Sequence, residues 1–158
     1  MGTTLAIDPG RCTGVAVSDA YGRMFACTAL SEERAAQWIL EVADASDWRA
    51  ERNCIIEVPQ IYPGERQKGD PNDLITLAVM VGRYGQIARE AGFFVTLVRP
   101  RTWKGQLPKN VCWSRVSATL TADELSIVET ASRYVGESLA HNMHDAIGLL
   151  TRFQKRWK

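Results

Sequence analysis

The chain has 158 residues, 46% of them hydrophobic and 23% charged, which excludes a disordered or fibrous protein and fits one globular domain with a sizeable core. No apolar run approaches the length of a membrane span, and a formal net charge of +1 neither demands nor excludes nucleic acid. The N-terminus opens directly into a strand-like segment, so we expect no signal peptide and a cytoplasmic protein.

Three strand-like segments open the chain. Thr3–Ile7 is a short apolar run that ends at Asp8-Pro9-Gly10. Gly14–Ser18 is apolar again, and Arg23–Leu30 can form a third strand. Because tight turns join them, these segments predict an antiparallel meander. Ser31, followed by two glutamates, predicts the start of a helix, with the acids at the positive end of its dipole.

The middle of the chain alternates strand and helix. Asn53–Val58 is a compact apolar strand, and Pro59–Pro71 is a long loop rich in Pro, Gly, Lys and Asp. We expect Asn72 or Asp73 to cap the next helix, and Phe93–Val98 to form a further strand after it. The apolar stripe of that helix consists of Leu74, Leu77, Val81, Tyr84 and Ala88.

The last third predicts mainly helix. A basic loop, Arg99–Asn110, leads to a helix-like segment, Val111–Gly136, in which Thr121 and Glu124 resemble a capping box. Ser138–Trp157 predicts a last helix. The resulting order, βββαβαβαα, indicates an α/β fold. We expect a mixed five-stranded sheet whose first three strands are antiparallel, flanked by helices, in a single domain of residues 1–158.

The four cysteines do not form a metal-binding or redox motif. They are scattered without a Cys-x-x-Cys pair and have mostly apolar neighbours, so we expect buried free thiols. They are Cys12, Cys27, Cys54 and Cys112.

Two carboxylates stand at the ends of apolar strands. Asp8 follows Leu5-Ala6-Ile7, and Glu57 follows Cys54-Ile55-Ile56. Such a group is costly to desolvate unless something pairs with it, and a metal ion does this well. If the two strands are neighbours, both acids project into one crevice. Each acid taken singly also has a purely structural explanation. Asp8 could be only a turn residue, and Glu57 could pair with a lysine.

A third acid lies on the last predicted helix. His141 and Asn142 precede Asp145 by four and three residues, so the three share a helix face. If the helix packs across the sheet, Asp145 completes a cluster of oxygen ligands suited to Mg²⁺ or Mn²⁺. A shared pair of ions could activate water and stabilise the leaving oxygen in phosphodiester hydrolysis. The structural alternative for Asp145 is a solvated helix residue.

Basic and aromatic residues are interleaved in two places, a pattern that suits phosphate contact and base stacking. The alternative is a solvated surface and a frayed tail, and for the tail both interpretations stay open. One group, Arg99, Arg101, Lys104 and Lys109, surrounds Trp103, and the other, Arg152, Lys155, Arg156 and Lys158, surrounds Trp157.

Together these segments resemble the RuvC family of Holliday-junction resolvases, especially the RuvC-like proteins of phages. The resemblance lies in four stretches spread over nearly the whole chain: Leu5–Gly10 with Thr13–Ala16, Ile55–Pro59, Pro100–Lys104, which carries a Trp-Lys element, and His141–Gly148. It implies an RNase H-like fold, a homodimer, and Mg²⁺- or Mn²⁺-dependent incision of branched DNA with two ions per active site. It further implies roles in DNA recombination and repair, and the host cytoplasm if the chain is phage-encoded.

By this resemblance Asp8 would bridge two ions, and Glu57 and Asp145 would each help to hold one. The sequence departs from the family where a second helical acid is usual, three residues before Asp145, because Asn142 stands there. We expect His141 or Asn142 to supply the fourth group. His144 points roughly 100° away from Asp145 on a regular helix, so we expect it to pack or lie at the surface. An imidazole ligand would favour Mn²⁺ over Mg²⁺.

Several residues are candidates for DNA contact. The loop after Glu57 leaves from the catalytic edge and offers Tyr62 for base stacking, although a surface loop is the alternative. The resemblance suggests a phosphate contact for Lys104, with Trp103 as a packing residue beside it. The remaining basic candidates are Arg11, Arg66, Lys68 and Arg101.

Three other functions compete with a junction resolvase. Asp8-Pro9-Gly10 with Thr13-Gly14 also resembles the first phosphate loop of the actin and sugar-kinase superfamily, but the chain is short for two such domains and has no Gly-rich second loop. A nuclease acting on forks, flaps or RNA would use the same catalytic residues. Asn142 also suggests a catalytically weak protein that only binds junctions.

Overall fold

The computed structural model describes residues 2–47, 49–61 and 70–157. The expected order of strands is confirmed, and four helices follow the last strand. The strands are β1 (Thr4–Asp8), β2 (Thr13–Ser18), β3 (Met24–Leu30), β4 (Asn53–Glu57) and β5 (Phe94–Val98). The helices are α1 (Glu32–Ala45), α2 (Pro71–Glu90), α3 (Pro100–Trp103), α4 (Lys109–Ser117), α5 (Ala122–Val135) and α6 (Glu137–Phe153).

The five strands form one mixed sheet in the order β3-β2-β1-β4-β5. As expected, β1, β2 and β3 are antiparallel neighbours. β4 runs parallel to β1 on one side and to β5 on the other. The first and fourth strands therefore lie side by side and end at the same edge of the sheet.

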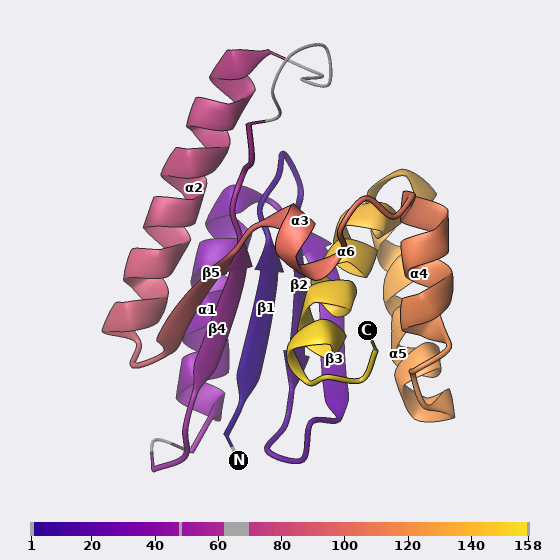
Figure 1. Ribbon diagram of the computed structural model, residues 1–158. Helices are drawn as coiled ribbons and strands as arrows, with labels where there is room; N and C mark the ends of the chain where they lie inside the picture. The colour runs from indigo at the N-terminus through magenta and orange to yellow at the C-terminus, as the bar shows by residue number, and fades with distance from the viewer. Residues whose placement is uncertain (1, 48, 62–69, 158) are drawn as a thin grey trace.

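Helices cover both faces of the sheet, which gives three layers (Figure 1). On one face Leu5 and Ile7 of β1 pack with residues of α1 and α2, among them the fully buried Tyr84. On the other face Ala6 and Ala16 are small, which lets α6 lie close to the strands, while α5 packs beside it on β3 and α4 packs against α6. The alternation along β1 thus sends its large side chains to one core and its small ones to the other.

The structure differs from the sequence-based expectations at several helix ends. Pro71 forms the first turn of α2, and the N-cap is Asp70, whose side chain accepts a hydrogen bond from the Asn72 N–H at 2.9 Å, rather than Asn72 or Asp73. The segment Val111–Gly136 is two helices, because Thr121 has extended backbone and caps α5 with the expected capping box. The basic loop contains the short α3, and the last helix ends at Phe153 instead of Trp157.

The cysteines are free thiols, as expected, and three of them are buried. Burial raises the pKa of Cys27 to about 12, which leaves this thiol unreactive at neutral pH. In the described part of the chain no helix has both the length and the apolar character of a membrane span.

Candidate active site

The two strand acids are neighbours at one edge of the sheet. Asp8 is the last residue of β1 and Glu57 the last residue of β4. These strands are parallel, with Ile7 opposite Ile56, so the next residues along each strand are the two acids. The juxtaposition expected from the two apolar runs is therefore present.

Helix α6 brings the third acid, Asp145, to the same edge. The helix crosses β2 so closely that a Cβ on Gly14 would lie 1.9 Å from the carbonyl oxygen of Asn142. Only glycine allows this approach. The Asn142 side chain donates a hydrogen bond to the Cys12 carbonyl at 2.7 Å, which fixes the start of α6 to the turn between β1 and β2. The glycine and this hydrogen bond together fix where α6 carries Asp145.

Lys104 links the second and third acids. Its Nζ lies 3.4 Å from Glu57 Oε2 and 3.4 Å from Asp145 Oδ1, and the three side chains are only 18%, 13% and 12% exposed. Lys109 Nζ lies 3.7 Å from the other oxygen of Asp145, but its side chain is 68% exposed. One ammonium is therefore built into the site and the other lies at its rim.

Trp103 positions this lysine and Glu57 together. Its ring is buried, and its Nε1–H donates a hydrogen bond to Glu57 Oε2. A Cβ on Gly148 would lie 2.8 Å from the ring, so the glycine makes room for it in the face of α6. Trp157 meets the same ring edge-on, with centroids 6.1 Å apart. Trp103 is thus a packing residue, as expected, and it also orients a carboxylate.

The electrostatics of the cluster are those of crowded, desolvated acids. Burial, followed by repulsion from Glu57 and Asp145, raises the pKa of Asp8 well above its usual value. Burial also raises the pKa of Glu57, although Lys104 and the Trp103 hydrogen bond oppose this. Burial alone would lower the pKa of Lys104, but the attraction of the three acids outweighs it and raises that pKa. The cluster therefore favours a bound cation.

These residues suit a hard divalent ion chemically. All three donors are carboxylates, and the Asp8 carboxylate has no hydrogen bond or ion pair with any described residue. The arrangement is not a complete metal cage, because Lys104 holds both Glu57 and Asp145. Within the described residues, no three His, Cys, Asp or Glu side chains are grouped closely enough to hold an ion.

The two histidines of α6 have different surroundings. His141 is exposed and, with Lys109 and Asn110, lines a cavity of about 210 Å³ beside Asp145. His144 stacks on Trp113, with ring centroids 3.7 Å apart and planes 6° from parallel. Burial lowers the pKa of His144, so it is neutral at pH 7. His144 thus packs against Trp113, which is one of the two alternatives expected for it.

The structure describes only some of the candidate DNA-contacting residues. Arg11 is exposed in the turn between β1 and β2, three residues after Asp8, and Arg101 is exposed on α3. Tyr62, Arg66 and Lys68 lie outside the described residues.

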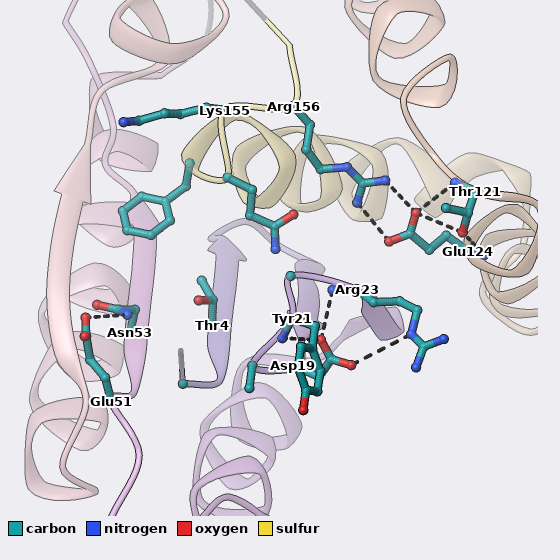
Figure 2. Close-up of a pocket in the computed structure, with 15 residues that line it drawn as sticks. Thr4, Asp19, Tyr21, Arg23, Glu51, Asn53, Thr121, Glu124, Lys155 and Arg156 are labelled. Carbon is teal, nitrogen blue, oxygen red and sulfur yellow. Dashed lines mark hydrogen bonds and ion pairs between the residues drawn. The ribbon is translucent and has the colours of Figure 1, made fainter.

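The two arginines near the C-terminus, Arg152 and Arg156, have structural partners. Arg156 pairs with the buried Glu124, and Arg152 donates to the carbonyl of Trp157, whose ring is buried. Up to Trp157 the tail is therefore packed against the domain. A second cavity, of about 640 Å³, lies next to this ion pair (Figure 2). It is lined by Thr4 and Asn53 at the starts of β1 and β4, so it lies at the edge opposite the acids.

Two features of the site were not expected from the sequence. Lys109 was assigned only to a basic cluster, yet it contacts Asp145. The hydrogen bond from Trp103 to Glu57 joins residues 46 positions apart, and no local pattern indicates it.

No protein-family model matches the chain, and no curated protein matches it. Its structure is similar to that of Thermus thermophilus RuvC in complex with Holliday junction substrate, with a TM-score of 0.56 at 17% identity over 95% of this chain and 90% of that one. It is similar to a second Thermus thermophilus RuvC structure, with a TM-score of 0.55 at 18% identity over 95% of this chain and 92% of that one. The chain therefore has a RuvC-like, RNase H-like α/β fold, as the sequence motifs predicted.

Proposed function

We propose that the chain is a crossover-junction endodeoxyribonuclease, which resolves four-way DNA junctions by metal-dependent hydrolysis of paired phosphodiester bonds. The observation that carries this proposal is the convergence of Asp8, Glu57 and Asp145 with Lys104 at one sheet edge. Three acids around an ammonium suit phosphodiester hydrolysis, which needs both cation binding and phosphate neutralisation. The RuvC neighbour bound to a Holliday junction makes the four-way junction the first substrate to test.

The cofactor of the proposed reaction is Mg²⁺ or Mn²⁺, held by Asp8, Glu57 and Asp145. Such an ion activates water and polarises the phosphate. The resemblance implies two ions per active site. His141 and Asn142 are the candidates for a further ligand, and for Asn142 the ligand atom would be Oδ1, because its amide nitrogen donates to the Cys12 carbonyl. An imidazole ligand would make Mn²⁺ the better cofactor, so equal or greater activity in Mg²⁺ at matched concentration would remove His141 from the ligand set.

The protein's own residues bind and orient the DNA strand. Lys104 and Lys109 place two ammonium groups beside the acids, where the scissile phosphate would lie. Trp103 positions both Glu57 and Lys104: its Nε1–H donates a hydrogen bond to Glu57, and its ring contacts the Lys104 ammonium. Arg11 and Arg101 are exposed candidates for phosphate contacts farther along the strand. Tyr62, with Arg66 and Lys68, stays a proposal for the junction centre.

Symmetric incision requires two active sites, so we also propose a homodimer. The apolar stripe Leu77, Val81, Tyr84 and Ala88 of α2 packs on the sheet and is not free for this purpose. The outward side of the same helix exposes Ile75 and Val79, which are 64% and 66% exposed. These two residues are the candidate dimer contact.

The test uses a labelled four-way junction, a matched duplex, a splayed fork and an RNA duplex, each incubated with Mg²⁺, Mn²⁺ or EDTA. We expect paired nicks on the junction only, lost in EDTA and in Asp8→Asn. Equal cutting of the fork or of RNA would change the function to a structure-specific nuclease on those substrates. Junction binding without cutting in either metal would mean that the protein is a junction-binding module.

A further inference from the structure

Two lysine side chains offset most of the negative charge of the three acids. Asp8, Glu57 and Asp145 carry three formal negative charges, and Lys104 and Lys109 carry two positive ones. Asn142, three residues before Asp145 on α6, is uncharged, and its amide nitrogen donates to the Cys12 carbonyl. Few ligands and little negative charge therefore remain for two divalent ions.

Lys104 is placed where a cation between two of the acids would be. Its Nζ is equidistant, at 3.4 Å, from Glu57 and Asp145, and its side chain is 18% exposed. The Trp103 ring, whose centroid lies 4.8 Å from this Nζ, supports the ammonium from another side. The lysine is held on three sides by described residues, so it is a fixed part of the site rather than a mobile surface chain.

We propose that the Lys104 ammonium takes the place of a second divalent cation, so that each active site binds one ion, held by Asp8 together with Glu57 or Asp145. This inference rests on the proposed nuclease function and changes one element of it, the number of ions. Asp8 is the acid that no described residue pairs with, so it is the one free to hold the ion.

The physical argument is electrostatic. An ammonium close to two carboxylates already neutralises one of their charges, and it repels a divalent ion that would occupy the same space. In a desolvated site this repulsion is strong, because little water screens it. The same ammonium can supply the positive charge that a second ion would direct at the phosphate, without needing ligands of its own.

The experiment measures Mn²⁺ binding to the free full-length protein by electron paramagnetic resonance of the unbound ion, confirmed by calorimetry. We expect one Mn²⁺ per wild-type chain and none at this site in Asp8→Asn. Lys104→Met, which keeps most of the length of the side chain and removes its charge, should bind a second Mn²⁺ and hold the first on the order of tenfold more tightly. Lys104→Arg keeps the charge and should still bind one ion, and circular dichroism checks the folding of each variant.

Lys109→Met is the matched control, because it removes a lysine that contacts the same Asp145 from an exposed position. It should still bind one ion. Two Mn²⁺ per wild-type chain, none per wild-type chain, or an unchanged count of one in Lys104→Met would each overturn the inference. The junction-cleavage assay separates this from the proposed function: a wild-type protein that binds two ions and cuts junctions would refute only the single-ion site.

Discussion

At the scale of single residues, Glu57 has two favourable contacts, one with the last residue of α3, Trp103, and one with its C-cap, Lys104. Trp103 donates a hydrogen bond to Oε2, and Lys104 lies 3.4 Å from the same oxygen. Both contacts favour the ionised carboxylate, which burial disfavours. The orientation of Glu57 therefore depends on a ring that makes no hydrogen bond with Asp8 or Asp145.

We predict that Trp103→Phe lowers junction cleavage roughly 10- to 100-fold, a typical effect of losing a hydrogen bond that orients a metal ligand. The phenyl ring cannot donate to Glu57, and it also lacks the outer indole atoms, Cζ3 and Cη2, that lie nearest Gly148, so the control must measure the loss of packing. The measurement is single-turnover cleavage at saturating protein. Trp157→Phe is the control, because Trp157 meets Trp103 edge-on and donates to Thr151 instead. Equal losses in both variants would mean that Trp103 acts only through packing.

Site residues could be predicted where a local sequence pattern indicates a buried strand. They could not be predicted where contacts between distant parts of the chain determine what a side chain does. Asp8 and Glu57 could be found because each carboxylate ends an apolar run, and the sheet places them together. The use of the Asn142 amide on the Cys12 carbonyl could not be predicted, since it depends on how closely α6 crosses β2 at Gly14.

At the scale of elements, the start of α5 is fixed by one buried ion pair. Glu124 is 1% exposed and accepts hydrogen bonds from the backbone N–H groups of Met24 and Thr121 and from Arg156, which lies close to it in Figure 2. Burial would raise the pKa of Glu124, but the Arg156 hydrogen bond and the two backbone N–H groups lower it to about 2. One side chain thus ties α5 to β3 and to the C-terminal segment.

We predict that Glu124→Gln lowers the free energy of unfolding by about 3–5 kcal/mol at pH 7, because it leaves Arg156 without its charged partner. The measurement is urea denaturation. Glu129→Gln is the matched control, since its pair with Arg133 is exposed on the same helix and should matter by less than about 1 kcal/mol. Equal effects of the two substitutions would contradict a special role for the buried pair.

The same pair predicts how stability depends on pH. The folded-state pKa of Glu124, about 2, lies below its usual 4.5, so the contribution is complete above pH 4.5 and is lost as the pH falls through about 2. The difference in unfolding free energy between wild type and Glu124→Gln should therefore shrink from pH 5 to pH 2. A difference that stays constant over this range would contradict the low pKa.

The elements themselves were largely predictable, with exceptions that have local causes. All five strands and the helix after Ser31 follow from apolar runs and caps. The boundary between α4 and α5 was missed although its capping box was recognised, because Val116, Leu120 and Val128 face one core across the break and continue the apolar pattern. The start of α2 was predicted two or three residues too late, because Pro71 occupies the first turn and makes the preceding Asp70 the cap.

At the scale of the whole molecule, the candidate active site lies at the edge of the sheet where β1 and β4 end, and the proposed dimer contact belongs to α2, whose place beside the sheet is shown in Figure 1. Leu77 and Val81 of α2 pack in the core, whereas Ile75 and Val79 are exposed. The amphipathic pattern alone could not separate these roles, because both sides of the helix carry apolar residues.

We predict that Val79→Asp shifts the protein from dimer to monomer, because a charge in an apolar contact is costly to bury. The measurement is sedimentation equilibrium over a range of protein concentrations. Tyr134→Asp is the control, since Tyr134 is 88% exposed on α5, in the layer on the other face of the sheet. A Val79→Asp protein that stays dimeric would place the dimer contact elsewhere.

The most direct test of a dimeric metal-dependent resolvase is cleavage of a supercoiled plasmid that extrudes a cruciform, followed over time in Mn²⁺. If two sites act within the lifetime of one complex, the plasmid should become linear with few nicked circles, and Asp8→Asn should leave it supercoiled. Val79→Asp should yield nicked circles or no product, because its two sites are no longer held together. Nicked circles alone from the wild-type protein, or linear product from the Asp8→Asn protein, would contradict the account.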